Sequence, residues 1–526
     1  MNWTRDLVHI PTRSGANYYF APTTQEELRN IVLKAKLAGV NIRVSGQRHS
    51  QPPLVVSDNR VSQSYNSDQW LVDLSCYADL GPSGNEPIIV DKEQNTVTVN
   101  TGVREDYLDA FLSTQALILE TVTAGGFFSI GGMTAVDVHG ATVGAGIFSE
   151  TVVRFTIMNA EGIVHTVDEE TAAQHGWKAI QFARVSLGAL GIVTAVTIKV
   201  KPRPYATTLS GELLESTLTS KADFIARFQE ILTGEACYQR IESFFNPYDH
   251  TFLMLCWRLL DQPPEETPNK TSNDVPSACN YASQDSYGAP YESKIVEHIS
   301  DTLIYDLQFS KSTFTAKETI FAAYDQIKKQ FLAAKKNYSD LWLTKAARVS
   351  FNSYFIPISQ IDEAGLGVAW DALQVVPRQL AKTDDFRLVG PMEFRFVKGG
   401  NTAMAGTWAD EADQETWFVN IDAIGFVHPT DASEYRGELL NFFAAIEREW
   451  YGSFGGIPHN GKMYGFYNPE DDSGYTPPFN KSFLADLAQR RGDRLKAFEA
   501  YRQQQDPDGR FLNEFLRSLG LGSSES

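Results

Sequence analysis

The sequence has few cysteines, no long apolar run and a shortage of positive charge. Four of its 526 residues are cysteines, and none of them forms a CxxC pair. We therefore expect neither a zinc site nor a disulfide framework, but idle thiols in a reducing compartment. No apolar stretch approaches the length of a membrane-spanning helix, and residues 1–13 lack the charged-then-apolar pattern of a signal peptide. These absences predict a cytoplasmic protein without a membrane span.

The charge balance limits the partners. The chain carries 46 Lys and Arg against 65 Asp and Glu, which gives a net charge of −19. Nucleic acid and anionic membranes attract basic surfaces, so neither is expected as the main partner. The nine histidines show no HExxH or comparable ligand spacing. This argues against a metal site, and against a metal-dependent hydrolase built on His49, His139 and His459. Once nucleic acid, an anionic membrane and a metal ion are set aside, a small molecule is the partner that we expect.

The first informative segment is the loop at residues 45–50. A predicted helix over 25–39 leads into a predicted strand over 41–44, which ends in a glycine-containing turn. Successive backbone N–H groups in such a turn can form an anion-binding concavity, although an ordinary strand-to-loop turn would look the same. Arg48 adds positive charge, and His49 offers a nucleophilic ring nitrogen. The candidate cofactor loop contains Ser45, Gly46, Gln47, Arg48, His49 and Ser50.

Two further glycine-rich segments follow. Residues 123–142 crowd five glycines around short apolar pieces, which lets the backbone approach a flat ligand closely. They lack the GxGxxG spacing of a dinucleotide-binding Rossmann unit, and a bulged loop would explain the glycines nearly as well. Residues 187–197 predict a turn that enters a strand. Between these segments, a strand pair is expected over 151–167.

In this order, the three segments resemble the flavin-binding loops of the vanillyl-alcohol-oxidase-type (PCMH-type) FAD-linked oxidases. The resemblance implies FAD that is bonded covalently through His49 to the flavin 8α-methyl group. It also implies that Ser129 lies near the isoalloxazine, that residues 140–143 line the pyrophosphate, and that the backbone near Ile192 contacts adenine. Beyond the first loop, the implied cofactor residues are Ser129, Gly132, Asp137, Gly140, Ala141, Thr142, Val143 and Ile192.

Two predicted strands later in the chain carry polar residues on one face. Glu393 and Arg395 are two residues apart, so they share a face on a strand. Asn420 and Asp422 have the same spacing within residues 417–423. A solvated strand surface would show this pattern too. The Glu-x-Arg strand resembles that of the aldonolactone, alditol and type II sterol oxidases, in which the pair faces the flavin and the substrate.

Two C-terminal segments extend this resemblance. Residues 459–462, His-Asn-Gly-Lys, are similar to a His-Trp-Gly-Lys segment of the lactone and alditol oxidases, with Asn460 in place of Trp. The match implies that Lys462 points at the substrate oxygen. Residues 505–513 resemble the Asp-Pro-x-x-Arg-Phe-x-Asn terminus of the same subgroup. The implied catalytic residues are Glu393, Arg395 and Lys462, and the implied substrate contacts are Phe128, Ser129, Asn420, Asp422 and His459.

Length and resemblance together predict an α+β protein in two parts. A chain of 526 residues exceeds one compact core. We expect a PCMH-type FAD-binding domain over residues 1–205 and an α+β cap domain with an antiparallel sheet over residues 206–455. Residues 456–526 should return to the FAD-binding domain.

The resemblance implies an FAD-dependent oxidase that oxidises a CH–OH group by hydride transfer to flavin N5 and reduces O2 to hydrogen peroxide. Glu393 would orient Arg395, but the base that takes the hydroxyl proton stays open. Chain length points to a larger, partly apolar, sterol-like alcohol, and an aldonolactone or alditol is the alternative. In the related oxidases, the position of Phe128 borders the route of oxygen to the flavin. The bulky side chain there makes a dehydrogenase with another acceptor a further alternative. A flavin-binding protein without turnover is a further alternative, which the retained charged residues oppose.

Overall fold

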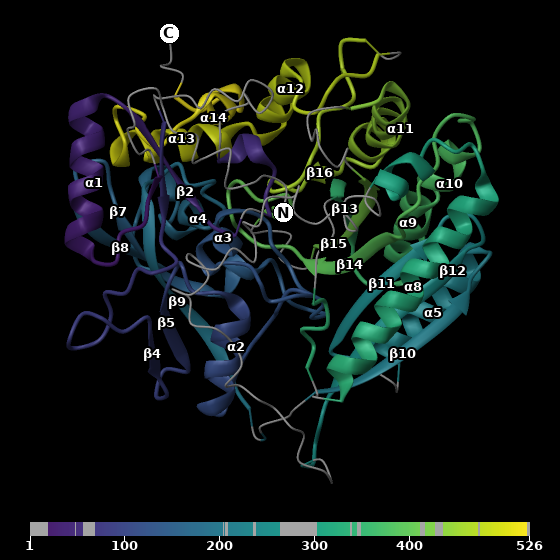
Figure 1. Ribbon diagram of the computed structural model, residues 1–526, viewed down its shortest axis with the longest axis horizontal. Helices are drawn as coiled ribbons and strands as arrows, with labels where there is room; N and C mark the ends of the chain where they lie inside the picture. Colours follow the sequence, from purple (N-terminus) through teal and green to yellow (C-terminus); the bar gives the residue numbers. More distant parts are fainter. Residues whose placement is uncertain are drawn as a thin grey trace.

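The computed structural model has two parts that face each other, with the C-terminal helices along the top (Figure 1). Among the described residues, no helix combines the length and the apolarity that crossing a bilayer requires. Arg48 of the predicted cofactor loop lies outside the described residues. The structure describes residues 19–47, 49–55, 69–203, 205, 209–234, 238–263, 302–336, 339–344, 349–410, 416–426, 435–471 and 474–522.

A small parallel sheet with strand order β1-β3-β2 begins the fold, and α1 packs beside it. Thr24 Oγ1 accepts the N–H of Glu27 at 3.3 Å, which begins α1, and Gly39 ends it in the left-handed conformation with φ 72°. Leu28 and Val32 of α1 are buried in the core beneath the sheet. The bounds are β1 (Tyr19–Phe20), α1 (Gln25–Ala38), β2 (Asn41–Ser45), the 3-10 helix η2 (Pro52–Leu54) and β3 (Gln69–Asp73).

An antiparallel sheet completes the N-terminal part. Its strand order is β4-β5-β9-β7-β8, and β6 pairs with β9. Val97 and Val99 are fully buried on β5, as the period of two requires. The strands β7 and β8 form the expected hairpin. The bounds are β4 (Ile88–Asp91), β5 (Thr96–Asn100), α2 (Glu105–Thr114), β6 (Leu117–Leu119), α3 (Ile130–Ala135), η3 (Phe148–Thr151), β7 (Val152–Met158), β8 (Val164–Asp168), η4 (Gln174–Gly176), α4 (Ile180–Ala183) and β9 (Ile192–Pro202).

A seven-stranded antiparallel sheet, called the cap sheet below, forms the centre of the second part. Its strand order is β10-β12-β11-β14-β15-β13-β16. The bounds are β10 (Leu209–Thr217), α5 (Lys221–Thr233), β11 (Arg240–Asn246), β12 (Thr251–Leu259), α8 (Thr313–Lys335), β13 (Val349–Ser359), α9 (Glu363–Leu373), α10 (Val375–Leu380), β14 (Met392–Lys398), β15 (Trp417–Phe426), α11 (Gly437–Glu447), the π-helix η8 (Arg448–Ser453) and β16 (Ile457–Pro458).

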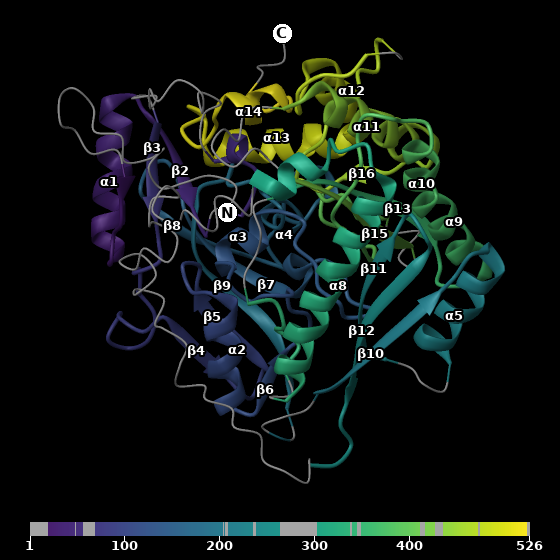
Figure 2. The same cartoon turned by 45° about the vertical axis from the view of Figure 1, so that its right-hand side comes forward.

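The two faces of the cap sheet are covered by different helices. On one face, Phe228 of α5 packs against Phe394 of β14, with ring centroids 5.5 Å apart. On the other face, Phe331 of α8 packs against Trp257 of β12 at 5.4 Å. Successive strand residues point to opposite faces, so the residues on either side of Phe394 face the α8 side. Figure 2 shows α8 standing between the N-terminal part and the cap sheet.

The C-terminal helices return to the N-terminal part (Figure 1). Arg43 Nη1 of β2 donates to the carbonyl of Phe511 at 2.6 Å, and Asn513 Nδ2 donates to the carbonyl of Pro53 at 2.8 Å. The chain therefore ends against the strand that leads into the first predicted loop. The bounds of the helices are α12 (Lys481–Arg491), α13 (Asp493–Gln505) and α14 (Glu514–Ser518).

The α+β class with antiparallel sheets is confirmed, but the cysteine prediction needs a correction. The expectation of idle thiols is wrong for Cys76, which is disulfide-bonded. Cys256 is a free thiol, and burial raises its pKa to about 12. Cys237 and Cys279 lie outside the described residues. Spacing along the sequence does not report distance in the fold, and a disulfide is typical of oxidising compartments.

Candidate active site

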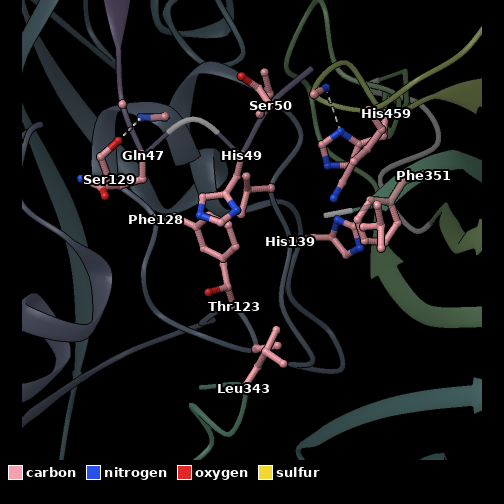
Figure 3. Close-up of a pocket in the computed structure, with 18 of the residues that line it drawn as sticks. Gln47, His49, Ser50, Thr123, Phe128, Ser129, His139, Leu343, Phe351 and His459 are labelled. Carbon is pink, nitrogen blue, oxygen red and sulfur yellow. Dashed lines mark hydrogen bonds between the residues drawn. The ribbon is translucent and has the colours of Figure 1, made fainter. Parts of the chain in front are cut away.

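A cavity of about 930 Å³ lies between the N-terminal part and the cap sheet. Figure 3 shows His49 beside Phe128 in this hollow, with His139, His459 and Phe351 grouped on its other side. We call its two sides the N-terminal wall and the cap wall. The N-terminal wall is lined from segments 43–47, 49–55, 73–75, 101–102, 123–139 and 186–193, and the cap wall from segments 242–244, 304–327, 342–343, 349–351, 389–395, 422–426 and 459–462.

The N-terminal wall consists largely of closely packed backbone. A Cβ atom added to Gly102 would lie 1.8 Å from the carbonyl oxygen of Leu74, and one added to Gly46 would lie 2.4 Å from Ser129 Oγ. At Gly102 the obstacle is backbone, which leaves room for glycine alone, whereas at Gly46 it is a side-chain oxygen. Ser129 caps α3 by accepting the N–H of Gly132 at 3.3 Å. The first two predicted loops therefore meet at this wall.

Arg43 holds several parts of the N-terminal wall together, a role that the sequence analysis missed. Its guanidinium donates to the carbonyls of Leu54 at 2.7 Å, Leu187 at 2.6 Å, Gly188 at 3.0 Å and Phe511 at 2.6 Å. Burial lowers its pKa to about 10, so it stays charged at neutral pH. One side chain thus joins the first loop, the third glycine-containing segment and the C-terminal tail. A charged residue between the apolar residues Ile42 and Val44 is the signal that could have identified it.

His49 lies on the N-terminal wall and lines the cavity. Its ring meets the Phe128 ring edge-on, with centroids 4.7 Å apart, and the tilted Phe127 ring at 5.0 Å (Figure 3). Two aromatic side chains therefore fix the imidazole beside the cavity. The position suits the predicted covalent attachment, which stays a prediction.

The predicted cofactor residues fall into two groups. Those that line the cavity are Ser45, Gly46, Gln47, His49, Ser50, Ser129 and Gly132. Those outside its lining are Asp137, Gly140, Ala141, Thr142, Val143 and Ile192. The Ala141 carbonyl accepts the N–H of Ile241 at 2.7 Å, and Asp137 accepts the N–H groups of Gly406 at 2.8 Å and Asn460 at 2.7 Å. These contacts join the two parts of the protein, and a cofactor role for this second group stays a prediction.

The cap wall carries its polar residues in neighbouring rows across the strands. Register places Arg395 opposite Asn420. The next row, in strand order, is Phe244, Glu393, Asp422 and Ser353. The pairs beyond it are apolar, because Ile424 lies opposite Phe351 and Phe426 lies at the level of Val349. The wall is therefore charged at one end and apolar at the other.

Arg395 lies between two carboxylates. Its Nη2 contacts Glu242 Oε1 at 2.7 Å and also Glu393 Oε1. Trp342 Nε1 donates to Glu242 Oε2 at 2.9 Å. Burial opposes the charge on Arg395, but the carboxylates of Glu242 and Glu393 outweigh burial and raise its pKa. The guanidinium is a fixed cation in the cavity wall, and Glu242 and Trp342 are site residues that the sequence analysis missed.

Two carboxyl groups face each other across β14 and β15. Glu393 and Asp422 are direct register partners, and like charges in this arrangement destabilise a sheet. Burial raises the pKa of Glu393 to about 8, and Arg395 opposes this rise. Burial also raises the pKa of Asp422, and the charge of Lys462 opposes it. The two shifts show that burial and mutual repulsion disfavour the state in which both carboxyl groups are charged.

Lys462 joins this group from the segment after β16. Its Nζ lies 3.7 Å from the centroid of the Phe351 ring, which favours a cation. Burial lowers the pKa of Lys462, while the charges of Asp422 and Glu393 oppose this effect. Glu393, Arg395 and Lys462 all line the same cavity, although Lys462 is far from the other two along the chain.

Two buried histidines lie next to this group. His139 bonds through Nδ1 to the Asp137 carbonyl at 3.1 Å and through Nε2 to Asn420 Oδ1 at 3.0 Å. Burial and the charge of Arg395 lower the pKa of His139 to about 3, and burial lowers that of His459 well below its usual value. Both rings are neutral at physiological pH, and Asn420 does not line the cavity. The predicted substrate contacts that do line it are Phe128, Ser129, Asp422 and His459.

The donor set of the cavity suits an organic cofactor. Peptide groups and glycine surfaces on the N-terminal wall can receive a flat ring system and a diphosphate. Within the described part of the chain, no group of three or more His, Cys, Asp or Glu side chains is placed to hold a metal ion. FAD, which the resemblance implies, therefore fits the residues of this wall.

Comparison with known proteins agrees with this assignment. Residues 16–168 match the family described as FAD binding domain, and residues 337–519 match the family described as D-arabinono-1,4-lactone oxidase. L-Gulonolactone oxidase of Mus musculus is 27% identical over 202 residues, 38% of this chain and 40% of that protein. D-Arabinono-1,4-lactone oxidase of Candida glabrata is 27% identical over 189 residues, 36% of this chain and 33% of that protein. The match thus spans less than half the length of each of these curated relatives.

A solved structure extends the likeness to almost the whole chain. Cholesterol oxidase from B. sterolicum superimposes with a TM-score of 0.68 and 17% sequence identity, covering 95% of this chain and 93% of that one. At this identity, the likeness shows the fold. The N-terminal part therefore has a PCMH-type FAD-binding fold.

Proposed function

We propose that this chain, a vanillyl-alcohol-oxidase-type FAD-linked oxidase close to the aldonolactone, alditol and type II cholesterol oxidases, oxidises the CH–OH group of a small molecule. Aldonolactones are the first substrate class to test, because residues 337–519 match the D-arabinono-1,4-lactone oxidase family. The observation that carries the proposal is that Glu393, Arg395 and Lys462 line the same cavity as the glycine-rich loops. Residues of a solvated strand surface would not converge in this way.

The chain contributes position and charge to this reaction. FAD, when bound, supplies the acceptor for a hydride. Arg395, held by Glu242 and Glu393, and Lys462 place two cations where negative charge develops on the substrate oxygen. Their interactions with that charge are screened less in a buried site than in water.

The N-terminal wall would hold the cofactor. Gly46 and Gly132 bring backbone to the cavity surface, where peptide N–H groups can bind the pyrophosphate. His49 lies on the same wall and would carry the covalent bond to the flavin. Electrons would then pass to O2 and give hydrogen peroxide, with Phe128 beside His49 bordering the route of oxygen.

A second substrate candidate is a larger, partly apolar alcohol of the sterol type. Towards α8 the cap wall is mainly apolar, although Thr319 and Gln326 of α8 also line the cavity. A polyol placed against the apolar part would leave hydroxyl groups without hydrogen-bond partners, which costs free energy. Ala322 and Ala323 of α8 are small and leave space at this wall. The apolar residues that line it are Phe244, Trp342, Leu343, Val349, Phe351, Val389, Ile424 and Phe426.

Colour and bleaching test the proposal. The purified protein should be yellow, and anaerobic addition of a substrate should bleach the flavin absorbance. The panel contains aldonolactones, alditols and sterols, with hydrogen peroxide measured after air is admitted. A colourless protein that binds no FAD contradicts the cofactor. A yellow protein that no compound bleaches is a flavin-binding protein without turnover. Bleaching without peroxide in air identifies a dehydrogenase.

A further inference from the structure

We propose that Asp422 is the base that takes the hydroxyl proton of the substrate. This inference rests on the proposed oxidation and assigns the role that the sequence left open. Besides Asp422, the groups around the polar end of the cap wall that could accept a proton are Glu242, Glu393, Lys462, His139 and His459. Their contacts separate them. Both carboxyl oxygens of Glu242 already have partners, because Oε1 contacts Arg395 Nη2 and Oε2 accepts from Trp342 Nε1.

Asp422 lines the cavity, and one of its two carboxyl oxygens is buried without a hydrogen-bond donor among the described residues. Its side chain is 5% exposed, and that oxygen is Oδ1. A buried carboxylate oxygen without a donor costs free energy. The hydroxyl group of a bound substrate would supply that donor. Ser353, the register partner of Asp422 on β13, hydrogen-bonds to its carboxyl group and lowers its pKa.

Glu393 is less suited to this role. Its Oε1 contacts Arg395 Nη2, so this oxygen already serves to hold the guanidinium. Burial raises its pKa to about 8, while the charge of Arg395 opposes this rise. Asp422 faces Glu393 directly, so repulsion disfavours the state in which both carboxyl groups are ionised.

The histidines and the lysine are also less suited. Both ring nitrogens of His139 have partners, and Nδ1 of His459 accepts the N–H of Gly461 at 2.9 Å. Burial lowers the pKa of both rings, which makes them weak bases. Lys462 lies over the Phe351 ring, a position that favours its cationic form. Lys462 can therefore stabilise the oxygen from which Asp422 removes the proton.

In the proposed step, the substrate loses one proton and one hydride. The O–H bond of the substrate breaks, and its proton passes to Asp422 Oδ1. The electron pair of that O–H bond forms the second carbon–oxygen bond, while the C–H bond breaks and its electron pair leaves with hydrogen as hydride. Oxidised FAD is the two-electron acceptor, and the substrate becomes a carbonyl compound. The charges that act on Asp422 are those of Lys462, Arg395 and Glu242, and Glu393 is its register partner. The neutral rings of His139 and His459 lie near Lys462.

Rapid-mixing measurements of flavin reduction across pH test this assignment. In the unmodified enzyme the rate should fall towards acid pH, because protonated Asp422 cannot accept a proton. Asp422→Asn should slow reduction by about a hundredfold or more and remove this acid limb. Ser353→Ala should move the limb to higher pH, because it removes the bond that lowers the pKa of Asp422. Glu393→Gln should keep the limb, at a lower overall rate.

A binding measurement separates catalysis from folding. The carbonyl product, which cannot be oxidised at that carbon, should still perturb the flavin absorbance of Asp422→Asn, and FAD content should equal that of the unmodified enzyme. The assignment is overturned if Asp422→Asn keeps the acid limb, or if Glu393→Gln loses it. It is also overturned if Asp422→Asn no longer binds product, because Asp422 would then serve binding. If no substrate reduces the unmodified enzyme, the proposed function itself fails, and the assignment of a base fails with it.

Discussion

The two walls of the cavity differ in whether backbone or side chains form most of their surface. The N-terminal wall has backbone packed so closely at Gly102 that a single added methyl group would collide with the Leu74 carbonyl. The cap wall consists of side chains in rows, charged near Arg395 and apolar towards α8. A backbone wall fixes a shape, and a side-chain wall fixes charge and chemical selectivity. The first suits a cofactor of constant form, and the second suits a particular substrate.

This difference predicts opposite sensitivities. Adding an atom to the N-terminal wall should reduce FAD binding, because backbone cannot move aside without moving a whole loop. Removing a charge from the cap wall should slow turnover. In a buried site, nothing else can replace the lost charge in stabilising the substrate oxygen. Variants of each kind, with FAD content and flavin reduction measured separately, test this difference between the two walls.

The largest effect is expected on the cap wall. Arg395→Met and Lys462→Met should each slow flavin reduction by on the order of a hundredfold or more, the usual scale for losing one charge-stabilising donor. FAD content should stay normal, because neither residue belongs to the N-terminal wall. Arg258→Met and Lys221→Met are matched controls, since both remove a half-exposed cation that pairs with an acid outside the cavity. Unchanged reduction rates in both active-site variants would remove the support for this site.

The next effect is expected on the N-terminal wall. Gly102→Ala should reduce FAD content and destabilise the protein by about 1–3 kcal/mol, because its Cβ has no room against the Leu74 carbonyl. Thermal unfolding and the ratio of flavin to protein absorbance measure the two effects. Gly452→Ala is the control, since a Cβ there meets nothing within 4 Å. Full FAD content in Gly102→Ala would show that the wall yields more easily than proposed.

On strands whose side chains alternate between two faces, the sequence predicted which residues of the cap wall share a face. Glu393 and Arg395 share a face because side chains on a strand repeat every two residues, and the same rule pairs Asn420 with Asp422. The rule gives no partner strand, however, so it could not show that Asn420 bonds to His139 and lies outside the cavity lining.

Glu242 was missed for a related reason. All seven residues of β11 are buried, so the strand shows no alternation from which an inward face could be read. An acidic residue within a buried strand was the available signal, because such a group needs a partner. That partner, Arg395, is far along the chain, and only the fold brings the two side chains together.

The glycine-rich loops were predictable as a set, and their partners were not. Ser45, Gly46, Gln47, Ser129 and Gly132 line the cavity, and their contact with a cofactor stays a prediction. Residues 140–143 bind to β11, which lies about a hundred residues further on, and local sequence carries no information about such pairing. The same limit explains the wrong expectation for Cys76.

A smaller effect is expected at the apolar end of the cap wall. Ala323→Phe would fill space at the α8 wall and should lower kcat/KM for a bulky alcohol relative to an aldonolactone by about tenfold, the scale of a few steric contacts in an apolar pocket. The ratio of the two values measures selectivity independently of overall damage. Ala333→Phe, exposed on the same helix and outside the cavity lining, is the matched control. An unchanged ratio would place the substrate away from α8.

The smallest effect on rate is expected at His49. In the unmodified enzyme, acid denaturation should leave the yellow colour with the precipitated protein, because the proposed bond to His49 survives unfolding. In His49→Ala the colour should appear in the supernatant. Flavin reduction should slow by no more than about tenfold, since the backbone of the N-terminal wall still positions the cofactor and one factor of ten corresponds to only about 1.4 kcal/mol of barrier. His165→Ala, on β8 and outside the cavity lining, should retain the bound colour. If all colour from the unmodified enzyme stays in the supernatant, the covalent bond is wrong. If His49→Ala instead loses FAD completely, His49 holds the cofactor more strongly than a backbone wall requires, and the contrast between the two walls weakens.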